Sequence, residues 1–204
     1  MKNEIIVVSG GIGSGKSTFI KAINEFSEVK VDFFSFDDFT KELFKRSDVQ
    51  DFLMIMFGTT DQLKISDMVF KHEALLQSLN EFLFQFVEEK FLELVNTKHH
   101  HPLVIEFPMF FEVKEISDAI KFVRDKFKVV LITADDSVRI NRVKHRNNFT
   151  EEKIKNIMVA QMSQEKKAVL ADYVVDTSNQ ETKHAAEQLM KNKFKKVFFS
   201  AQMV

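Results

Sequence analysis

Hydrophobic residues along the chain follow two patterns, which predict two kinds of secondary structure. Short runs that are continuously apolar, or that alternate in polarity, are typical of strands. Longer stretches with apolar residues every three or four positions are typical of helices that pack on a sheet. Five short runs are predicted as strands, at residues 5–8, 29–36, 103–108, 128–133 and 172–176. Because helical patterns separate them, we predict a three-layer α/β fold with a five-stranded parallel sheet.

Helical patterns fill most of the sequence between these strands. The longest covers residues 73–95, and residues 47–96 contain helical patterns without any predicted strand. This part is therefore predicted as an all-helical insertion, whose stripe of phenylalanine and leucine we interpret as core packing rather than as a ligand-binding surface. The other predicted helices cover residues 16–26, 39–45, 136–146 and 182–199.

Composition narrows the class of protein. A length of 204 residues fits one domain with a sizeable core. With 29 basic and 30 acidic residues, the net charge of -1 gives no electrostatic footprint for nucleic acid. The absence of cysteine excludes disulfides, thiolate metal ligands and cysteine nucleophiles. No apolar run approaches a membrane span, and the first residues lead into a strand rather than a signal peptide, so we predict a cytoplasmic protein without membrane association.

The strongest motif lies between the first strand and the first helix. Residues 9–17 read SGGIGSGKS and satisfy G-x-x-x-x-G-K-[ST] at every fixed position. Glycines at this turn permit positive φ and leave room for backbone N–H groups to converge on an anion. The helix that follows adds the unpaired N–H groups of its first turn. The motif predicts a P-loop and a nucleotide-binding P-loop NTPase fold.

The residue types of the loop assign their roles. We predict that the loop backbone surrounds the phosphates of ATP, and that Lys16 reaches the β- and γ-phosphate oxygens. The Ser17 hydroxyl is placed to bind Mg²⁺, and Thr18 offers a further hydroxyl near the α-phosphate. The residues predicted to bind the nucleotide are Gly11, Gly13, Ser14, Gly15, Lys16, Ser17 and Thr18.

Two acidic positions are predicted at the same edge of the sheet, because ligands bind at the carboxyl ends of parallel strands. Asp37 and Asp38 follow the second strand, and a kinase that phosphorylates an alcohol needs a base beside the hydroxyl. Asp37 is the first candidate and Asp38 the second. One of the two is expected to cap the helix predicted to begin at Phe39.

The third predicted strand also ends in an acid. If this strand lies beside the first, Glu106 would approach Ser17 and could hold the water shell of Mg²⁺, and a purely structural carboxylate is the alternative. The histidines at residues 99–101 precede this strand. They are not predicted to bind metal, because adjacent residues of a loop rarely converge on one ion.

Two subregions are predicted around this centre within one domain of residues 1–204. Residues 47–97 form a helical cap that covers the acceptor, and residues 139–165 form a helix, a turn and a helix that act as a lid over ATP. Arg142 and Arg146 lie one turn apart on the lid and are predicted to neutralise the transferring phosphoryl group. Arg139 is interpreted as a solvated surface residue.

Further short motifs lie after the P-loop. Glu106 opens the sequence EFPMFFE, which ends at Glu112, and Arg142 and Arg146 form an R-x-x-x-R pattern that FTEE follows at residues 149–152. A late segment carries three more matches, at Gln161-Met162, at Lys167 and in ADYVVD at residues 171–176. With the P-loop and the acid after the second strand, these motifs resemble those of the dephospho-CoA kinase family over most of the chain.

The resemblance implies an activity. By it, the chain transfers the γ-phosphate of ATP to the ribose 3′-hydroxyl of dephospho-CoA, the last step of coenzyme A synthesis, with Mg²⁺ as the metal. Lys16, Asp37, Arg142 and Arg146 would be the catalytic residues. A nucleoside or nucleotide kinase of the P-loop class is the alternative, and a non-catalytic ATP-binding relative is a third reading. The sequence makes no prediction of the oligomeric state.

The chain departs from the family pattern at three places. Lys41 stands where the family usually has arginine. In the cap, Gln77-Ser78 replaces a His-Pro pair, and an arginine expected before Val69-Phe70 has no counterpart. The two departures in the cap concern the acceptor rather than the nucleotide.

Overall fold

The computed structural model describes residues 4–69, 72–147 and 149–199. Its centre is one sheet of five parallel strands in the order β2-β3-β1-β4-β5. The prediction of a five-stranded parallel sheet is confirmed. The strands are β1 (Ile5–Ser9), β2 (Asp32–Ser35), β3 (Leu103–Glu106), β4 (Phe127–Thr133) and β5 (Tyr173–Asp176).

Strand β1 is the centre of the sheet and is buried along its whole length. It pairs with β3 on one side and with β4 on the other, and Val8 lies opposite both Glu106 and Val130. β2 extends the sheet beyond β3, with Ser35 opposite Glu106. All strands are parallel, so the carboxyl ends of β1, β2 and β3 meet at one edge.

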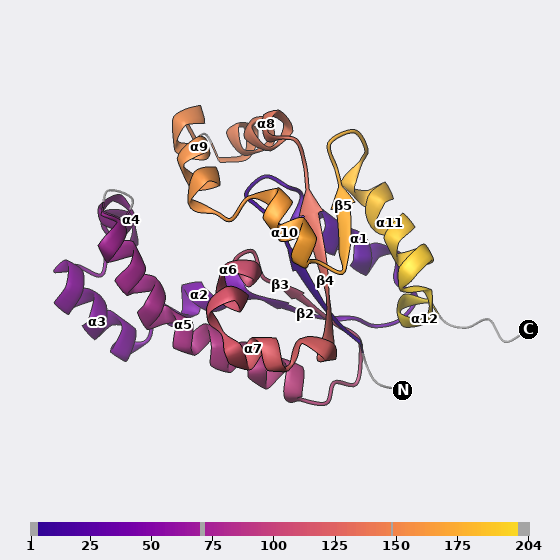
Figure 1. Cartoon of the computed structure of the whole chain (residues 1–204), viewed down its shortest axis with the longest axis horizontal. Helices are drawn as coiled ribbons and strands as arrows, with labels where there is room; N and C mark the ends of the chain where they lie inside the picture. The colour runs from indigo at the N-terminus through magenta and orange to yellow at the C-terminus, as the bar shows by residue number, and fades with distance from the viewer. Residues whose placement is uncertain (1–3, 70–71, 148, 200–204) are drawn as a thin grey trace, which may run out of the picture.

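Helices cover both faces of the sheet, which gives three layers (Figure 1). On one face lie α1 (Lys16–Phe26), α11 (Thr182–Lys193) and α12 (Lys195–Phe198). On the other face lie α5 (Glu73–Asn96), α6 (Phe110–Ile116), α7 (Asp118–Phe122) and α10 (Gln164–Leu170), with the short 3₁₀ turn η1 (Arg124–Lys126) after α7.

The second face is packed mainly by phenylalanine. Phe91 of α5 is fully buried, and its ring lies 5.1 to 6.3 Å from those of Phe36, Phe107, Phe110 and Phe127. Such aromatic clusters stabilise through large buried area and edge-to-face contacts. This cluster joins the C-terminal half of α5 to the sheet.

The helical insertion has a small core of its own. Helices α3 (Ser47–Phe57) and α4 (Gln62–Val69) pack with the N-terminal half of α5 around Val49, Leu53 and Leu79. The rings of Phe52 and Phe82 stack at 3.7 Å between centroids. The aromatic stripe is thus core, as predicted. Figure 1 shows this group projecting from one end of the sheet, with α5 as the shared element.

Helix α2 (Phe36–Leu43) begins three residues earlier than predicted, and β2 is shorter than the predicted 29–36 strand. The cause is Ser35, whose Oγ accepts a hydrogen bond of 3.3 Å from the N–H of Asp38. Ser35 is therefore the N-cap, and the expectation that an aspartate caps this helix is wrong. Asp37 and Asp38 lie in the first turn, where their charge complements the helix dipole.

Helices α8 (Asp136–Asn147) and α9 (Glu151–Ala160) form the predicted helix, turn and helix. Thr150 caps α9 by accepting from the N–H of Lys153. The predicted final helix is interrupted at Phe194, a buried residue between α11 and α12. Some residues of the predicted regions lie outside the described residues. They include Phe70 of the cap, residue 148 of the 139–165 segment, and residues 1–3 and 200–204 at the ends of the 1–204 domain. Within those that are described, no helix is long and apolar enough to cross a membrane.

The phenylalanine cluster predicts a large loss of stability on truncation. Phe91→Ala should lower the free energy of unfolding by about 3–5 kcal/mol, because it opens a cavity between four rings. Thermal unfolding followed by circular dichroism should show a midpoint lower by roughly 6 to 20 °C. Phe122, which is 89% exposed, is the control, and Phe122→Ala should change stability by less than about 0.5 kcal/mol. Equal effects of the two substitutions would contradict the packing.

Candidate active site

The loop between β1 and α1 is shaped by its glycines. Gly13 and Gly15 have φ of 75° and 101°, in the left-handed region that other residues rarely adopt. A Cβ at Gly13 would lie 2.5 Å from the carbonyl oxygen of Arg139. The motif therefore needs glycine here both for the turn and for the close approach of α8.

The loop presents unpaired hydrogen-bond donors. Among the described residues, no partner is found for the backbone N–H groups of Gly13, Gly15, Lys16 and Ser17. Gly15, the N-cap of α1, provides no side-chain cap, and the buried Oγ of Ser14 has no hydrogen-bond partner. Unpaired amides at a helix N-terminus are the chemistry that binds phosphate. The residues present therefore fit the phosphates of a nucleotide.

Lys16 lies across this loop. Its Nζ donates to the carbonyl oxygens of Gly10 and Gly11 at 2.8 and 3.0 Å. Burial lowers the pKa of Lys16 to about 8, against the opposing effect of the carboxylates Glu106 and Asp37. The lysine is thus a partly desolvated cation close to the open amides, where an anion would stabilise it.

Glu106 and Ser17 meet because β3 pairs with β1. Ser17 Oγ donates to Glu106 Oε1 at 3.2 Å. Burial raises the pKa of Glu106, and the charge of Asp37 raises it further. A hydroxyl and a carboxylate beside a phosphate site are the oxygen donors that Mg²⁺ uses together with water and phosphate. In the described part of the chain, no group of three or more histidine, aspartate or glutamate residues could hold a metal ion.

Asp37 and Asp38 differ in their surroundings. The charge of the exposed Asp37 raises the pKa of both Lys16 and Glu106, so this carboxylate lies near the phosphate loop. Asp38 Oδ1 accepts from Lys41 Nζ at 2.6 Å, and this contact lowers the pKa of Asp38. The structure therefore leaves Asp37 available for an acceptor and pairs Asp38 with a lysine.

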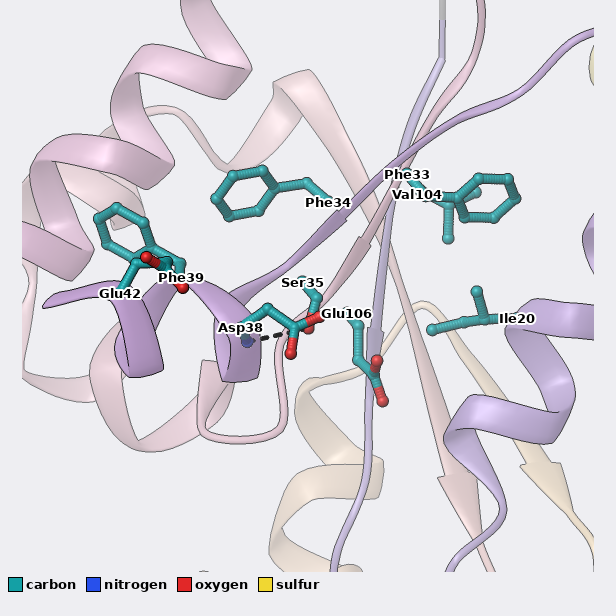
Figure 2. Close-up of a pocket in the computed structure, with 9 residues that line it drawn as sticks. All are labelled: Ile20, Phe33, Phe34, Ser35, Asp38, Phe39, Glu42, Val104 and Glu106. Atoms are coloured by element: carbon teal, nitrogen blue, oxygen red, sulfur yellow. Dashed lines mark hydrogen bonds between the residues drawn. The ribbon is translucent and has the colours of Figure 1, made fainter. Parts of the chain in front are cut away.

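A cavity of about 470 Å³ opens beside these carboxylates. Figure 2 shows Asp38, Ser35 and Glu106 between two groups of apolar side chains, with Phe33 and Ile20 on one side and Phe34 and Phe39 on the other. The remaining lining residues are Glu42 and Val104. Asp38 and Glu106 are thus open to a ligand in this cavity, whereas Asp37 is not among its lining residues.

The two predicted lid arginines lie in different places. Arg142 Nη1 donates to Thr177 Oγ1 at 2.9 Å and to the loop carbonyl of Ser14 at 3.3 Å. Arg146 is exposed, and its Nε donates to Asn147 Oδ1 at 2.7 Å. The structure therefore brings Arg142, but not Arg146, to the phosphate loop.

Arg139 is a contact of the loop that the sequence analysis missed. It is 5% exposed, its Nε donates to the carbonyl oxygen of Ile12 at 2.9 Å, and its Nη1 pairs with Asp136 at 3.0 Å. The interpretation of Arg139 as a surface residue is wrong. Its spacing of three residues from Arg142 places both on one face of α8, and this signal could have revealed it.

A buried ion pair lies behind the loop. Lys167 Nζ is 2.8 Å from Glu112 Oε1, and the side chain of Lys167 is 1% exposed. The same carboxylate oxygen accepts from the N–H of Met162 at 3.0 Å. Both residues belong to matched motifs, but no role was predicted for them. The pair joins α6 to α10 beneath the site.

Comparison with known proteins agrees with this geometry. The family model for dephospho-CoA kinase matches residues 4–183. The chain belongs to the dephospho-CoA kinase family. The resemblance found in the sequence is thereby confirmed, and as a member of this family the chain is an ATP-dependent kinase.

Relatives in the family are distant but span nearly the whole chain. The dephospho-CoA kinase of Fusobacterium nucleatum is 28% identical over 189 residues, which cover 88% of this chain and 92% of that protein. That of Lactobacillus acidophilus is 28% identical over 202 residues, covering 91% and 95%. The likeness is therefore not confined to the P-loop.

Solved structures share the fold. A protein of Thermus thermophilus superposes with a TM-score of 0.73 at 22% identity, covering 97% of this chain and 99% of that one. The dephospho-CoA kinase of Campylobacter jejuni gives 0.60 at 19%, covering 92% and 95%, and a shikimate kinase of Bacteroides thetaiotaomicron gives 0.53 at 15%, covering 92% and 96%. The prediction of a P-loop NTPase fold is confirmed.

The lowered pKa of Lys16 predicts how nucleotide affinity depends on pH in this kinase. Protonated Lys16 attracts phosphate, and in the free protein this form is lost as the pH rises through about 8. The dissociation constant for MgADP, measured by calorimetry, should therefore rise about tenfold between pH 7 and pH 9. In Lys16→Met the affinity should be weak at both values. An affinity of the parent protein that is equal at pH 7 and pH 9 would contradict this role.

Proposed function

We propose that the chain transfers the γ-phosphoryl group of ATP to the ribose 3′-hydroxyl of dephospho-CoA, giving CoA and ADP. The observation that carries the proposal is the position of Asp37. It is an exposed carboxylate near the carboxyl ends of the strands, and its charge raises the pKa of both Lys16 and Glu106. An alcohol acceptor needs such a group next to the phosphates.

The loop side of the site would hold the nucleotide. The unpaired amides, together with Lys16, Ser14 and Thr18, bind the phosphates, and Gly11, Gly13 and Gly15 let the backbone approach them. Ser17 and Glu106 would hold Mg²⁺, whose charge offsets that of the phosphate oxygens. The proximity of Glu106 and Asp37, two like charges, supports a cation at this place.

Asp37 acts on the acceptor. Its carboxylate accepts the hydrogen of the 3′-hydroxyl, orients the oxygen toward the γ-phosphorus and takes the proton as the new O–P bond forms. The bond between the γ-phosphorus and the β–γ bridging oxygen breaks, and ADP leaves. Arg142 already lies at the loop, and Arg146 joins it on closure of the lid, where both stabilise the charge on the transferring group.

The cap and the lid enclose the rest of the acceptor in this proposal. A cavity of about 790 Å³ lies between α4 and α5 of the cap and α9 of the lid. Its walls are amphipathic, as a pantetheine arm with amides and methyl groups requires. They comprise Asp67, Val69, Leu76, Thr150, Glu152, Lys153, Asn156, Ile157, Val159 and Ala160.

The two departures in the cap fall beside this cavity, at Val69 and after Leu76. Gln77 and Ser78 follow Leu76 on α5, where Gln77 donates to Glu81 and the Ser78 hydroxyl donates to the carbonyl oxygen of Ala74. Both side chains therefore have hydrogen-bond partners within the helix. In this proposal Leu76, which lines the cavity, contacts the acceptor in their place.

Two other functions were considered from the sequence. Family membership favours dephospho-CoA over the acceptors of nucleoside and nucleotide kinases. The presence of Lys16, Ser17, Asp37 and Arg142 at one site supports catalysis over a role in ATP binding alone. We assign the reaction to the cytoplasm, because ATP is available there and because a chain without cysteine needs no oxidising compartment for disulfides.

The direct test is acceptor-dependent release of ADP. The purified protein with ATP and Mg²⁺ should release ADP rapidly only when dephospho-CoA is added, and mass spectrometry should identify CoA as the product. Uridine and adenosine serve as control acceptors and should give no stimulation. Stimulation of ADP release by a nucleoside would contradict the proposal. So would the absence of stimulation by every acceptor in protein that binds ATP.

The two neighbouring aspartates provide a matched pair of variants. Asp37→Asn should lower kcat by roughly 10² to 10⁴ while the affinity for ATP stays nearly constant, because a base is removed and the phosphate site is kept. Asp38→Asn, which weakens the exposed pair with Lys41 and keeps the shape of the side chain, should retain kcat within about threefold. Activity of Asp37→Asn near the parent value would remove Asp37 from this role.

A further inference from the structure

The backbone of Ile12, in the phosphate loop, is held on both sides of its Cα. The N–H of Ile12 donates to Gln161 Oε1 at 3.1 Å, and the carbonyl oxygen of Ile12 accepts from Arg139 Nε at 2.9 Å. A Cβ added at Gly11 would collide with Arg139 Nη2 and approach Gln161 Oε1 closely. Two side chains from different helices therefore converge on one residue of the loop and hold the peptide groups on either side of it.

These two side chains come from the two ends of the lid. Arg139 lies in the first turn of α8, and Gln161 is the residue at which α9 ends. The lid helices thus leave the sheet and return to it at points that touch the loop.

The segment that carries Gln161 is firmly attached to the rest of the domain. The next residue, Met162, donates its N–H to Glu112, which also pairs with the buried Lys167. Gln164 makes two hydrogen bonds with the backbone of Ala134, of 3.1 and 3.0 Å, at the end of β4. Gln161 therefore reaches the loop from a fixed support rather than from a free helix end.

We propose that Gln161 is a positioning residue for the nucleotide. It holds the Ile12 peptide so that the open amides of Gly13, Gly15 and Lys16 point to one place before the phosphates arrive. A loop with four glycines loses much conformational entropy when it is ordered, and a clamp that orders it in advance strengthens binding. The proposal rests on the nucleotide-binding half of the proposed function and not on the identity of the acceptor.

Gln161 is a better test than Arg139. Removal of Arg139 would also unpair Asp136 and empty a buried position of α8. Gln161→Leu removes the acceptor of the Ile12 N–H with little change in volume. Gln161→Glu keeps an oxygen at the same position, and the adjacent guanidinium of Arg139 offsets the added charge. Gln164→Leu is the matched control, because it removes two hydrogen bonds of the same segment without touching the loop.

The affinity of each variant for MgADP is measured by titration calorimetry, after thermal unfolding has verified that the variant is folded. Gln161→Leu should raise the dissociation constant about tenfold, and Gln161→Glu should restore it to within about threefold of the parent value. Gln164→Leu should lower the unfolding temperature but keep the dissociation constant within about twofold.

Steady-state kinetics give a second readout. In Gln161→Leu the KM for ATP should rise, whereas the KM for dephospho-CoA should stay constant. An unchanged affinity of Gln161→Leu for MgADP, or an equal loss in Gln164→Leu, would overturn the proposal. Because MgADP binding needs no acceptor, failure of the dephospho-CoA assay would leave this test intact.

Discussion

The site depends on the pairing of one strand with two neighbours. β1 is buried on both faces and is hydrogen-bonded to β3 and to β4. This pairing fixes the loop that follows β1 at the carboxyl edge of the sheet. The same pairing fixes Glu106 opposite Val8 and thereby within reach of Ser17. Without the β1–β3 register, the hydroxyl and the carboxylate would not meet.

Electrostatics at this edge follow from the sheet. Burial disfavours the charged forms of Lys16 and Glu106, so the pKa of Lys16 is lowered and that of Glu106 is raised. The charge of Asp37 acts on both residues. Anionic phosphates would stabilise the charged form of Lys16, and a cation would stabilise the charged forms of Glu106 and Asp37. The arrangement is thus suited to bind a charged nucleotide together with a metal, which agrees with membership of a kinase family.

Helices α8 and α9, which lie side by side in Figure 1, are joined to the phosphate loop by side chains. Arg139 and Arg142 enter from α8, and Gln161 enters from the end of α9. The end of α9 is attached to α6 and α10, because Glu112 accepts from the N–H of Met162 and pairs with the buried Lys167. A buried ion pair contributes little net stability, but it fixes the geometry of the groups around it.

The sequence by itself determined the five strands, the P-loop and the acids at the strand ends, because buried strands and glycine turns leave local patterns of residue type. It predicted that Glu106 would approach Ser17 if the third strand lay beside the first, and the structure supplied that pairing. Only the tertiary structure decided that Ser35, rather than an aspartate, caps α2, and that Arg139 is buried while Arg146 is exposed. The cap at Ser35 is a contact between residues three apart. The burial of Arg139 depends instead on its fit against Ile12 and Gly13, more than a hundred residues earlier in the sequence, and no local pattern encodes that contact.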